Sequence, residues 1–577
     1  MGRLFPFMKR HLQRWSLLLF VLALGLMPGC TTNYYRNSAD QEAYKLIKNK
    51  TPSVQNMDEH FTIEQTNQVS AGESRVVVTN TADYLGADGE KERGAQIFTL
   101  EKALETAVNH SRTYQSRKEQ LYLSALELAL ARHQFTPLFA ADGSASIVGQ
   151  TEQMVDSVSG GTNAVASENL VEKRRVEADG SINVSWLIRD VGRLSAAFTT
   201  DFVRVITRGP HTTSSSRVLA MFARPLLRNA GFQREKEVLT QAERDLLYAL
   251  REFTRFRKTF SVEVATSYYR VLGTRDTVRN SFLNLQSSKK NAERTRALAQ
   301  EGRVTQADLG RLEQQELSAE SSWINAVRNY KEALDNFKLD QLGLPVDIDL
   351  VLDDRELEAL EIRAPKISVD DSIKVALAAR LDYMNFRDRH DDALRNVKVA
   401  ANFLKPQVDF VAEAGFNSTP DGSTGFPVPD PKRYHWSAGL DVDPGLDRKS
   451  ERNSYRSAII TEKQAARALE QQADEIKLQV RDSWRTLDQA KRNYEISEVG
   501  VKIAERRVEE QNLLAELGRA KAQDQVDAQN ALNDSKNQRT QALVTHTITR
   551  LQFWNNLGIL YIKDNGQWEE IDDGNSQ

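Results

Sequence analysis

Two long stretches of the chain carry apolar residues at helical spacing and contain almost no helix-breaking residues. From 235 to 300 there is no proline and Gly273 is the only glycine, and from 450 to 517 there is no proline and Gly500 is the only glycine. A helix of about 65 residues is about 100 Å long. Spacings of three and four mark one buried helix face, and in the second stretch they run through Ile476, Val480, Trp484, Leu487, Ala490 and Tyr494.

Each long stretch ends at a glycine, which is where helices commonly stop. These glycines are Gly302 and Gly518, and a second helical pattern follows each of them. The second patterns end near a Leu-Gly pair, at 342–343 and at 557–558. The chain therefore predicts two antiparallel helical hairpins, with Gly302 and Gly518 at their turns.

Between the helical stretches lie segments in which apolar and polar residues alternate. One such segment places Asp409 and Glu413 opposite an apolar face. Alternation over about ten residues suits the strands of a transmembrane β-barrel, and a soluble half-buried sheet gives the same pattern. The apolar positions of this segment are Val408, Phe410, Ala412, Ala414 and Phe416.

The order of these patterns occurs twice. Tyr114 precedes Pro137 by 23 residues, and Tyr383 precedes Pro406 by the same number. Both prolines end a helical pattern and begin an alternating one, as the steric restriction before proline favours. The chain therefore predicts two tandem repeats.

The turn regions of the two repeats also match, but their middles differ in length. Residues 302–308, Gly-Arg-Val-Thr-Gln-Ala-Asp, correspond to residues 518–524, Gly-Arg-Ala-Lys-Ala-Gln-Asp. From Pro137 to Gly302 there are 165 residues, whereas from Pro406 to Gly518 there are 112. The first repeat thus carries 53 extra residues, which we expect to form an added hairpin and long loops.

These patterns divide the chain into segments. We expect a signal peptide at 1–29, a lipidated polar extension at 30–95, a first repeat at 96–345, a linker at 346–367, a second repeat at 368–560 and an acidic tail at 561–577. Within the first repeat the strands are expected at about 137–228 and the hairpin at about 233–343. Within the second repeat they are expected at about 406–443 and about 448–558.

The start of the chain has the composition of a secretory leader. Residues 1–29 contain basic residues, no acidic residue and an apolar run from Trp15 to Met27, which is short for a membrane-spanning helix. The only cysteine, Cys30, follows directly. This resembles a bacterial lipoprotein signal, in which the cysteine is lipidated and becomes the N-terminus; the alternative is a plain signal peptide with an incidental cysteine. No acid follows the cysteine, which in lipoproteins favours the outer membrane.

Composition narrows the possible classes of protein. The chain has 577 residues, 27% charged and 40% hydrophobic, and its mean hydropathy of -0.53 excludes a polytopic helical membrane protein. A formal net charge of -3 gives no overall electrostatic bias toward nucleic acid. One cysteine excludes a disulfide framework and multi-cysteine metal sites.

The chain resembles the outer-membrane efflux factor family, the TolC-like channel proteins, over about residues 95–560. The features that carry this resemblance are the tandem repeat, the helix–proline–strand order, the long hairpins and the turns in which an aspartate follows the glycine. The segment 447–453, Asp-Arg-Lys-Ser-Glu-Arg-Asn, is also typical of the family. The resemblance implies a mainly α fold with membrane β structure. In that fold, a homotrimer shares one outer-membrane β-barrel, which a long periplasmic α-helical barrel continues.

The resemblance also implies a function and a location. The chain would be the passive, gated channel of a tripartite efflux or type I secretion system. It would be lipid-anchored in the outer membrane of a Gram-negative-type bacterium and extend into the periplasm. Its partners would be a periplasmic adaptor (membrane fusion) protein, an inner-membrane transporter and outer-membrane lipid, without nucleic acid or cofactor. Three copies of four core strands would close a twelve-stranded barrel, and the extra residues leave the strand number open.

Charged residues at the hairpin turns are candidates for the periplasmic gate. Asp524 and Asp527 are three residues apart, on one helix face. In the family, acids at the matching positions line the closed entrance. Mutual repulsion there would raise the pKa values of some of these carboxyl groups, or the carboxylates would bind cations. The first repeat has Asp308 and Arg311 at these positions. The alternative is that an acid in a first helical turn only complements the helix dipole. The arginines that could pair with the acids are Arg303, Arg311 and Arg519.

The chain offers no recognisable catalytic or metal-binding motif. No two histidines lie within ten residues of each other, and no phosphate-binding loop or nucleophile elbow occurs. We therefore expect no enzyme activity. The competing interpretations are a lipid-anchored periplasmic coiled-coil protein without channel activity, and an enzyme with an unrecognised site. Trp186, Tyr434 and Trp436 could be interfacial aromatics or core residues.

Overall fold

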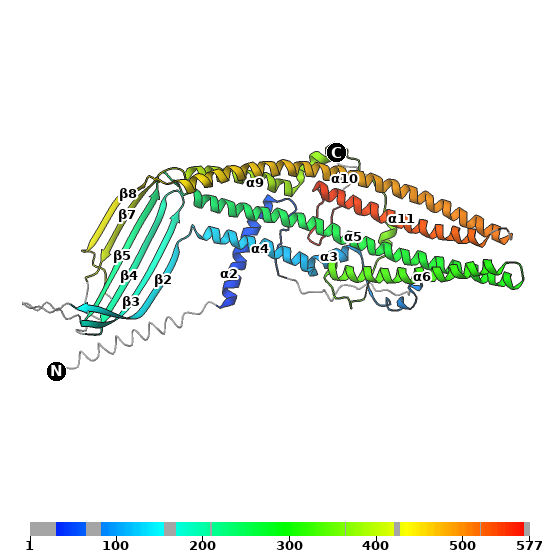
Figure 1. The fold of residues 1–577 in the computed structure, drawn as a ribbon, viewed down its shortest axis with the longest axis horizontal. Coiled ribbons are helices and arrows are strands. Elements are labelled where there is room, and N and C mark those ends of the chain that lie inside the picture. The colour runs from blue at the N-terminus through cyan, green and yellow to red at the C-terminus, as the bar shows by residue number, and fades with distance from the viewer. Residues whose placement is uncertain are drawn as a thin grey trace, which may run out of the picture.

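A computed structural model gives the fold of this chain. It describes residues 31–64, 82–154, 169–207, 211–363, 365–419, 427–517, 519 and 521–569. The expected signal peptide, Cys30, Gly518 and the end of the acidic tail from residue 570 lie outside the described residues. The molecule is elongated, with a sheet at one end and long helices running away from it (Figure 1).

Four long helices form the body. They are α5 (Gln233–Gln300), α6 (Gln306–Asn336), α10 (Lys449–Glu516) and α11 (Ala522–Leu557). The helices α5 and α6 form one antiparallel hairpin and α10 and α11 form the other, and both turns lie at the end farthest from the sheet (Figure 1). Residues of α5 pack against α6 and α11, and α11 packs against α10, so α6 and α10 lie at the two edges of this four-helix layer.

Shorter helices line the half of the body nearer the sheet. The pairs α3–α4 and α8–α9 each lead toward a strand, and α2 packs on α4. The bounds are α2 (Thr32–Lys50), α3 (Leu100–His110), α4 (Arg112–His133), α7 (Arg355–Glu358), α8 (Val369–Ala379) and α9 (Leu381–Asn402), with single 3-10 turns η1 (Thr51–Ser53) and η2 (Asp83–Asp88) and a π-helical turn η3 (Phe337–Leu342).

The sheet at the other end has six strands in the order β2-β3-β4-β5-β7-β8, and every neighbouring pair is antiparallel. The strands β2 and β8 are its edges. The bounds are β2 (Leu138–Met154), β3 (Asn169–Ile188), β4 (Gly192–Val205), β5 (Thr212–Pro225), β7 (Gln407–Asn417) and β8 (Tyr434–Asp443).

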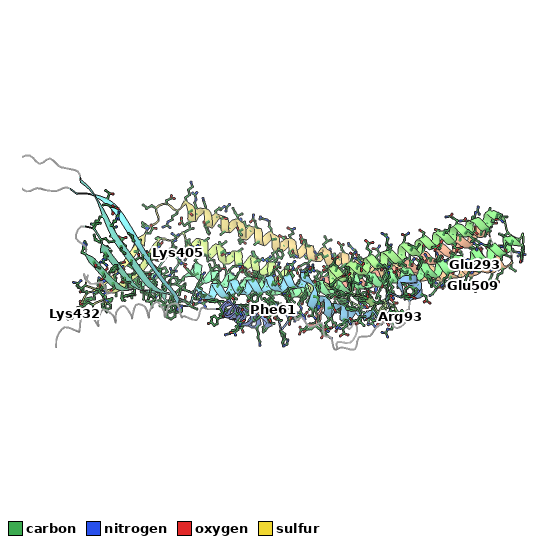
Figure 2. All side chains as sticks on the ribbon, turned by 90° about the horizontal axis from the view of Figure 1, so that it is seen from below. Phe61, Arg93, Glu293, Lys405, Lys432 and Glu509 are labelled. Carbon is green, nitrogen blue, oxygen red and sulfur yellow. The ribbon has the colours of Figure 1, made fainter. Side chains whose placement is uncertain are left out.

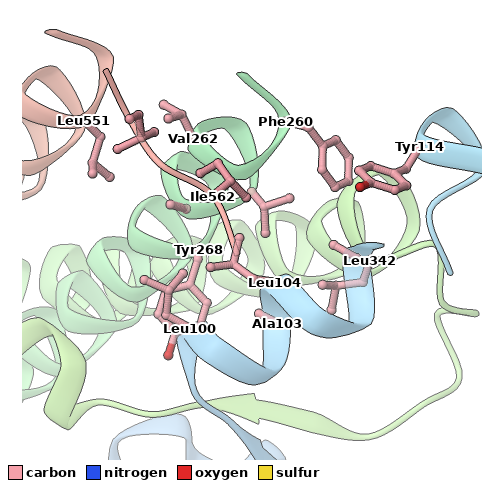
Figure 3. Close-up of a cluster of buried hydrophobic side chains, with 14 of the residues drawn as sticks. Leu100, Ala103, Leu104, Tyr114, Phe260, Val262, Tyr268, Leu342, Leu551 and Ile562 are labelled. Carbon is pink, nitrogen blue, oxygen red and sulfur yellow. The ribbon is translucent and has the colours of Figure 1, made fainter. Parts of the chain in front are cut away.

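The apolar core lies where the short helices meet α5. Leu100, Ala103 and Leu104 of α3 pack toward Val262 and Tyr268 of α5 (Figure 3). Tyr268 is fully buried, and its hydroxyl donates a 3.0 Å hydrogen bond to the carbonyl of Phe98. Phe553 and Trp554 of α11 are also buried in this cluster. The core thus fixes the middle of the body.

The segments expected as an extension and a linker both contact this core. Within 31–64 and 82–95, the α2 residues Ala43, Leu46 and Ile47 are buried. In the segment expected as a linker, β6 (Leu350–Leu352) pairs in parallel with β1 (Gln96–Phe98), so this linker contains a short strand.

The extension is also joined to the far end of the chain. The Asn56 side chain donates to the Ile562 carbonyl at 2.6 Å and accepts from the Ile562 N–H at 2.8 Å. The buried Arg257 of α5 donates to the carbonyls of Asn56 and Lys563, at 3.1 and 3.2 Å. Residues separated by almost the whole sequence therefore share one hydrogen-bonded cluster.

The predicted mainly helical fold with a sheet is confirmed. Among the described residues, no helix combines the length and the apolar character needed to cross a membrane.

Candidate functional site at the hairpin turns

The two hairpin turns have the same backbone hydrogen bond. In the first turn, Gly302 adopts φ +72°, its N–H donates to the carbonyl of Ala299, and the Arg303 N–H donates to the carbonyl of Leu298 at 3.0 Å. This is the Schellman arrangement that ends a helix. In the second turn, the Arg519 N–H donates to the carbonyl of Leu514 at 2.8 Å.

Asp308 takes part in the N-terminal cap of α6. The Thr305 hydroxyl accepts a hydrogen bond from the Asp308 N–H at 3.1 Å and donates to the Asp308 carboxylate at 2.7 Å. Such a cap satisfies a backbone donor at the helix start. Arg311 lies one turn further along and is exposed. The local role of Asp308 is therefore helix capping.

Asp524 and Asp527 lie on the first turns of α11, and both side chains are exposed. The Asp527 carboxylate accepts a hydrogen bond from the Gln523 side chain at 2.9 Å. Within the described part of the chain, neither aspartate forms an ion pair with Arg303, Arg311 or Arg519. The fold brings all these charged residues to one end of the molecule, but it does not pair them within one chain.

Two contacts hold the turn regions of the hairpins together. A small apolar cluster joins α5, α6 and α11 through Ala292, Leu312 and Ala522. The Arg294 guanidinium lies 3.9 Å from the Glu516 carboxylate, and this pair is too exposed to contribute much more than about 1 kcal/mol. Glu293 and Glu509 also lie on the arms near the turns, whereas Lys432 lies beside the sheet (Figure 2).

Next to this small cluster, the contact between the hairpins is polar rather than apolar. Polar side chains recur along α5 at 276, 280, 284 and 288, where a buried face would ordinarily carry apolar residues. Hydrogen bonds from the first hairpin to α11 join Asp276 to Thr540 at 2.6 Å, Asn280 to Asn537 at 3.0 Å and Gln315 to Asn530 at 2.7 Å.

An open cavity of about 320 Å³ interrupts this polar seam, between α5, α10 and α11. Asn284 and Asn533 line it, and their side-chain oxygens have no hydrogen-bond partner among the described residues. Asn284 is only 6% exposed. Sequence reasoning missed this seam, although the polar interruption of the apolar stripe on α5 was a usable signal.

A second feature that sequence reasoning missed is a buried charge cluster around Arg275 of α5. Its guanidinium donates to Glu92 at 2.9 Å and to the hydroxyls of Tyr330 and Tyr84 at 2.6 and 2.9 Å, and it lies 3.1 Å from Asp354. Burial lowers the pKa of Arg275, but its tyrosine and carboxylate neighbours outweigh burial and leave this pKa raised. The cluster joins four separate segments.

One histidine is buried without a hydrogen-bond partner. His546 of α11 is 0% exposed, and neither ring nitrogen has a partner in the described structure. Burial, with smaller contributions from Arg550 and Lys491, lowers the pKa of His546 to about 4. The ring is therefore neutral at ordinary pH.

Only one group of metal-type ligands comes together in the described parts of the chain. Asp58, His60 and Asp564 offer ligand atoms within 4.8 Å of one another. The buried Arg257 guanidinium lies 3.6 Å from Asp564 and already supplies positive charge there.

Comparison with known proteins identifies the fold. No family model matches the chain, and no curated protein matches its sequence. Among solved structures, the outer-membrane protein VceC from Vibrio cholerae is 14% identical, with 80% of this chain and 96% of that chain covered and a TM-score of 0.58. The outer-membrane channel CmeC from Campylobacter jejuni is 12% identical, with 82% and 87% covered and a TM-score of 0.58.

A third similar structure is the open state of the outer-membrane channel MtrE from Neisseria gonorrhoeae, at 13% identity, with 80% and 90% covered and a TM-score of 0.57. This chain therefore has the fold of outer-membrane channel proteins, and the predicted TolC-like resemblance is confirmed as a likeness of fold.

Proposed function

We propose that this protein is the outer-membrane channel of a tripartite efflux or type I secretion system. It conducts substrates passively from a periplasmic tunnel to the exterior. The observation that carries the proposal is the combination of a sheet that has an exposed apolar face with a body of four long helices. A periplasmic coiled-coil protein would have no use for such a face. On the sheet, Phe139 and Trp436 are 80% and 72% exposed, as suits contact with lipid.

The proposal requires a homotrimer, and the free edges of the protomer support one. An open sheet edge in lipid leaves backbone groups unpaired, at several kcal/mol each, so β8 of one copy pairs with β2 of the next. The edge helices carry exposed apolar residues at heptad spacing, which is typical of helix contacts. These residues are Leu317 and Ile324 on α6, Ile496, Val499, Ile503 and Leu513 on α10, and Leu517 directly after α10.

We also propose that the chain consists of two tandem repeats. Matching helix lengths support this. The helices α3 and α8 have 11 residues each, α4 and α9 have 22 each, and α5 and α10 have 68 each. Duplication of one unit accounts for these equalities without further assumptions.

The gate is proposed at the turns, where Asp524 and Asp527 of three copies surround the trimer axis. Their exposure in the single protomer supports this role, because they are free to meet charges on a neighbouring copy. Arg311 is exposed on the edge helix α6, where a neighbouring copy can reach it. Asp308 contributes through the cap of α6. Lipidation of Cys30, and docking to a periplasmic adaptor and an inner-membrane transporter, complete the proposal.

Planar-bilayer conductance of the purified protein tests this function. We expect a weakly conducting wild type and a more open Asp524→Asn/Asp527→Asn variant, because removing the charges weakens the closed arrangement. Asp534→Asn is the matched control, since Asp534 is an exposed acid further along the same helix. Equal conductance in all three proteins would reject the gate and keep the channel. Folded trimers without any conductance would favour the structural coiled-coil alternative.

A further inference from the structure

The sheet contains two more strands than the four per copy that close a twelve-stranded barrel. The strands β3 and β4 lie between β2 and β5 in the sheet order. They fall in the part of the first repeat that carries the 53 extra residues. The extra chain therefore forms a hairpin within the sheet, and the described strands continue on both sides of it.

Two successive rows of apolar residues run across the inserted hairpin. In these rows neighbouring strands pair apolar residue with apolar residue, so the face that would meet lipid includes β3 and β4. One such row is Ala141, Ile182, Phe198, Val218, Phe416 and Tyr434, and the next is Phe139, Val184, Ala196, Ala220, Ala414 and Trp436.

The opposite face of the same strands is polar and hydrogen-bonded. The Ser181 hydroxyl donates to the Asp142 carboxylate at 2.6 Å, and the Ser144 hydroxyl donates to Asp179 at 2.5 Å. Asp179 is also the cross-strand partner of Asp201. Alternation of a lipid-type face with a polar face is the pattern of a barrel wall around water.

The turn between the inserted strands β3 and β4 is fixed to the helical body. Asp190 adopts φ +64° in the turn between β3 and β4, and its carboxylate pairs with Lys236 in the first turn of α5. At the start of β4, a Cβ on Gly192 would lie 2.3 Å from the ring of Phe222 on β5. The hairpin thus packs tightly against both the next strand and the junction with the helices.

We propose that three copies of this six-stranded sheet close an 18-stranded barrel, with β3 and β4 in its wall. This proposal rests on the proposed trimeric channel. The strand directions allow closure, because successive strands alternate in direction, so β8 of one copy meets β2 of the next in antiparallel orientation. Barrel diameter grows roughly linearly with strand number, so this barrel is about half as wide again as a twelve-stranded one.

The width bears on what the channel accepts. Barrels of about 16–18 strands enclose an aqueous channel, and the inward face here carries aspartates and hydroxyls. The tunnel below is built from only four long helices per copy. We therefore expect size selection to fall to the helices rather than to the barrel wall.

Electron cryo-microscopy of the full-length protein in lipid nanodiscs counts the strands directly. We expect a trimer whose wall contains 18 strands. A trimer with a twelve-stranded wall, and β3 and β4 folded away from it, would overturn this inference and leave the channel function intact. Particles that are not trimers would overturn the proposed function as well, so the two failures are distinguishable.

Thiol labelling gives a second test with matched neighbours. In nanodisc trimers, a membrane-impermeant maleimide should label Ser181→Cys and Thr199→Cys on the polar face. It should leave Ile182→Cys and Phe198→Cys unlabelled, because lipid covers them. The wild type, with Cys30 alone, gives the background. Equal labelling of all four variants in conducting trimers would place the hairpin outside the wall and reject the proposal.

Discussion

The helices α5 and α10 have the same length, 68 residues, but they differ sharply in burial. In α5, nearly every turn from Leu246 to Thr295 buries a side chain, because α3, α4, α6, α9 and α11 surround it. The buried residues of α10 are Ile476, Val480, Leu487, Ala490, Val501 and Ala504.

This difference indicates that the protomer is complete around α5 and incomplete around α10. The stripe that α10 buries faces α11, α9 and α8, and a second apolar stripe through Ile496, Val499 and Ile503 remains exposed. Side chains on α5 should therefore determine whether one protomer folds. The exposed side chains on α10 should determine whether protomers assemble.

The largest effect is expected from charging the exposed stripe of α10. The triple variant Ile496→Glu/Val499→Glu/Ile503→Glu should lose the proposed trimer entirely, because burying three unpaired carboxylates between helices is prohibitive. Far-ultraviolet circular dichroism of the protomer should stay unchanged. Size-exclusion chromatography with light scattering, in detergent, measures the assembly.

Lys502→Glu is the control for this variant, because Lys502 is exposed on the same helix beside the stripe. It should keep the trimer. If the triple variant remained trimeric, the exposed stripe would not be the assembly surface. The expectation that α5 determines folding and α10 determines assembly would then be wrong.

The next effect is expected from Arg275→Ala on α5. Removing this guanidinium leaves the Glu92 carboxylate, which is 14% exposed, without its cation. Breaking a buried ion pair in this way destabilises a fold by about 3–5 kcal/mol. Chemical denaturation of the protomer measures the loss. Arg279→Ala is the matched control, since Arg279 is one turn away and 34% exposed; an equal loss in both variants would contradict the role of burial.

The smallest effect is expected from the pH dependence set by His546, inside the second hairpin. The lowered pKa, about 4, means that the unfolded chain takes up the proton at higher pH than the fold. The stability contributed by the neutral ring is complete above pH 6.5 and is lost as the pH falls toward 4. The loss amounts to about 1–3 kcal/mol.

Thermal unfolding of wild type and His546→Gln between pH 7 and pH 4 measures this loss as the difference between their curves. The variant should be less sensitive to acid over that range. Parallel curves for the two proteins would show that the pKa of His546 is the same in the folded and the unfolded chain.

The sequence was informative where a periodic pattern extends over many residues. The stripe through Ile476 and Val480 predicted a long helix with one buried face, and both side chains are fully buried. The alternation around Phe410 predicted strands, because a period of two has few other physical causes. The placement of the added strands within the sheet followed from cross-strand register, which the pattern of one strand does not specify.

The features that the sequence did not reveal depend on contacts between distant segments. Arg275 was one charged residue among many along α5, and its partners come from three other parts of the chain. At the candidate gate, the sequence indicated Asp524 and Asp527 by their residue type and spacing. It did not indicate their partners, because in the proposed assembly these belong to neighbouring copies.

The double hydrogen bond between Asn56 and Ile562 has a consequence for the kinetics of folding. Asn56 and Ile562 are 506 residues apart, so this contact can form only after Ile562 has left the ribosome. The free-energy cost of closing a loop grows only slowly with its length, but contacts between residues distant in sequence slow folding. The N-terminal segment is therefore expected to dock last, as the final step that locks an otherwise assembled protomer.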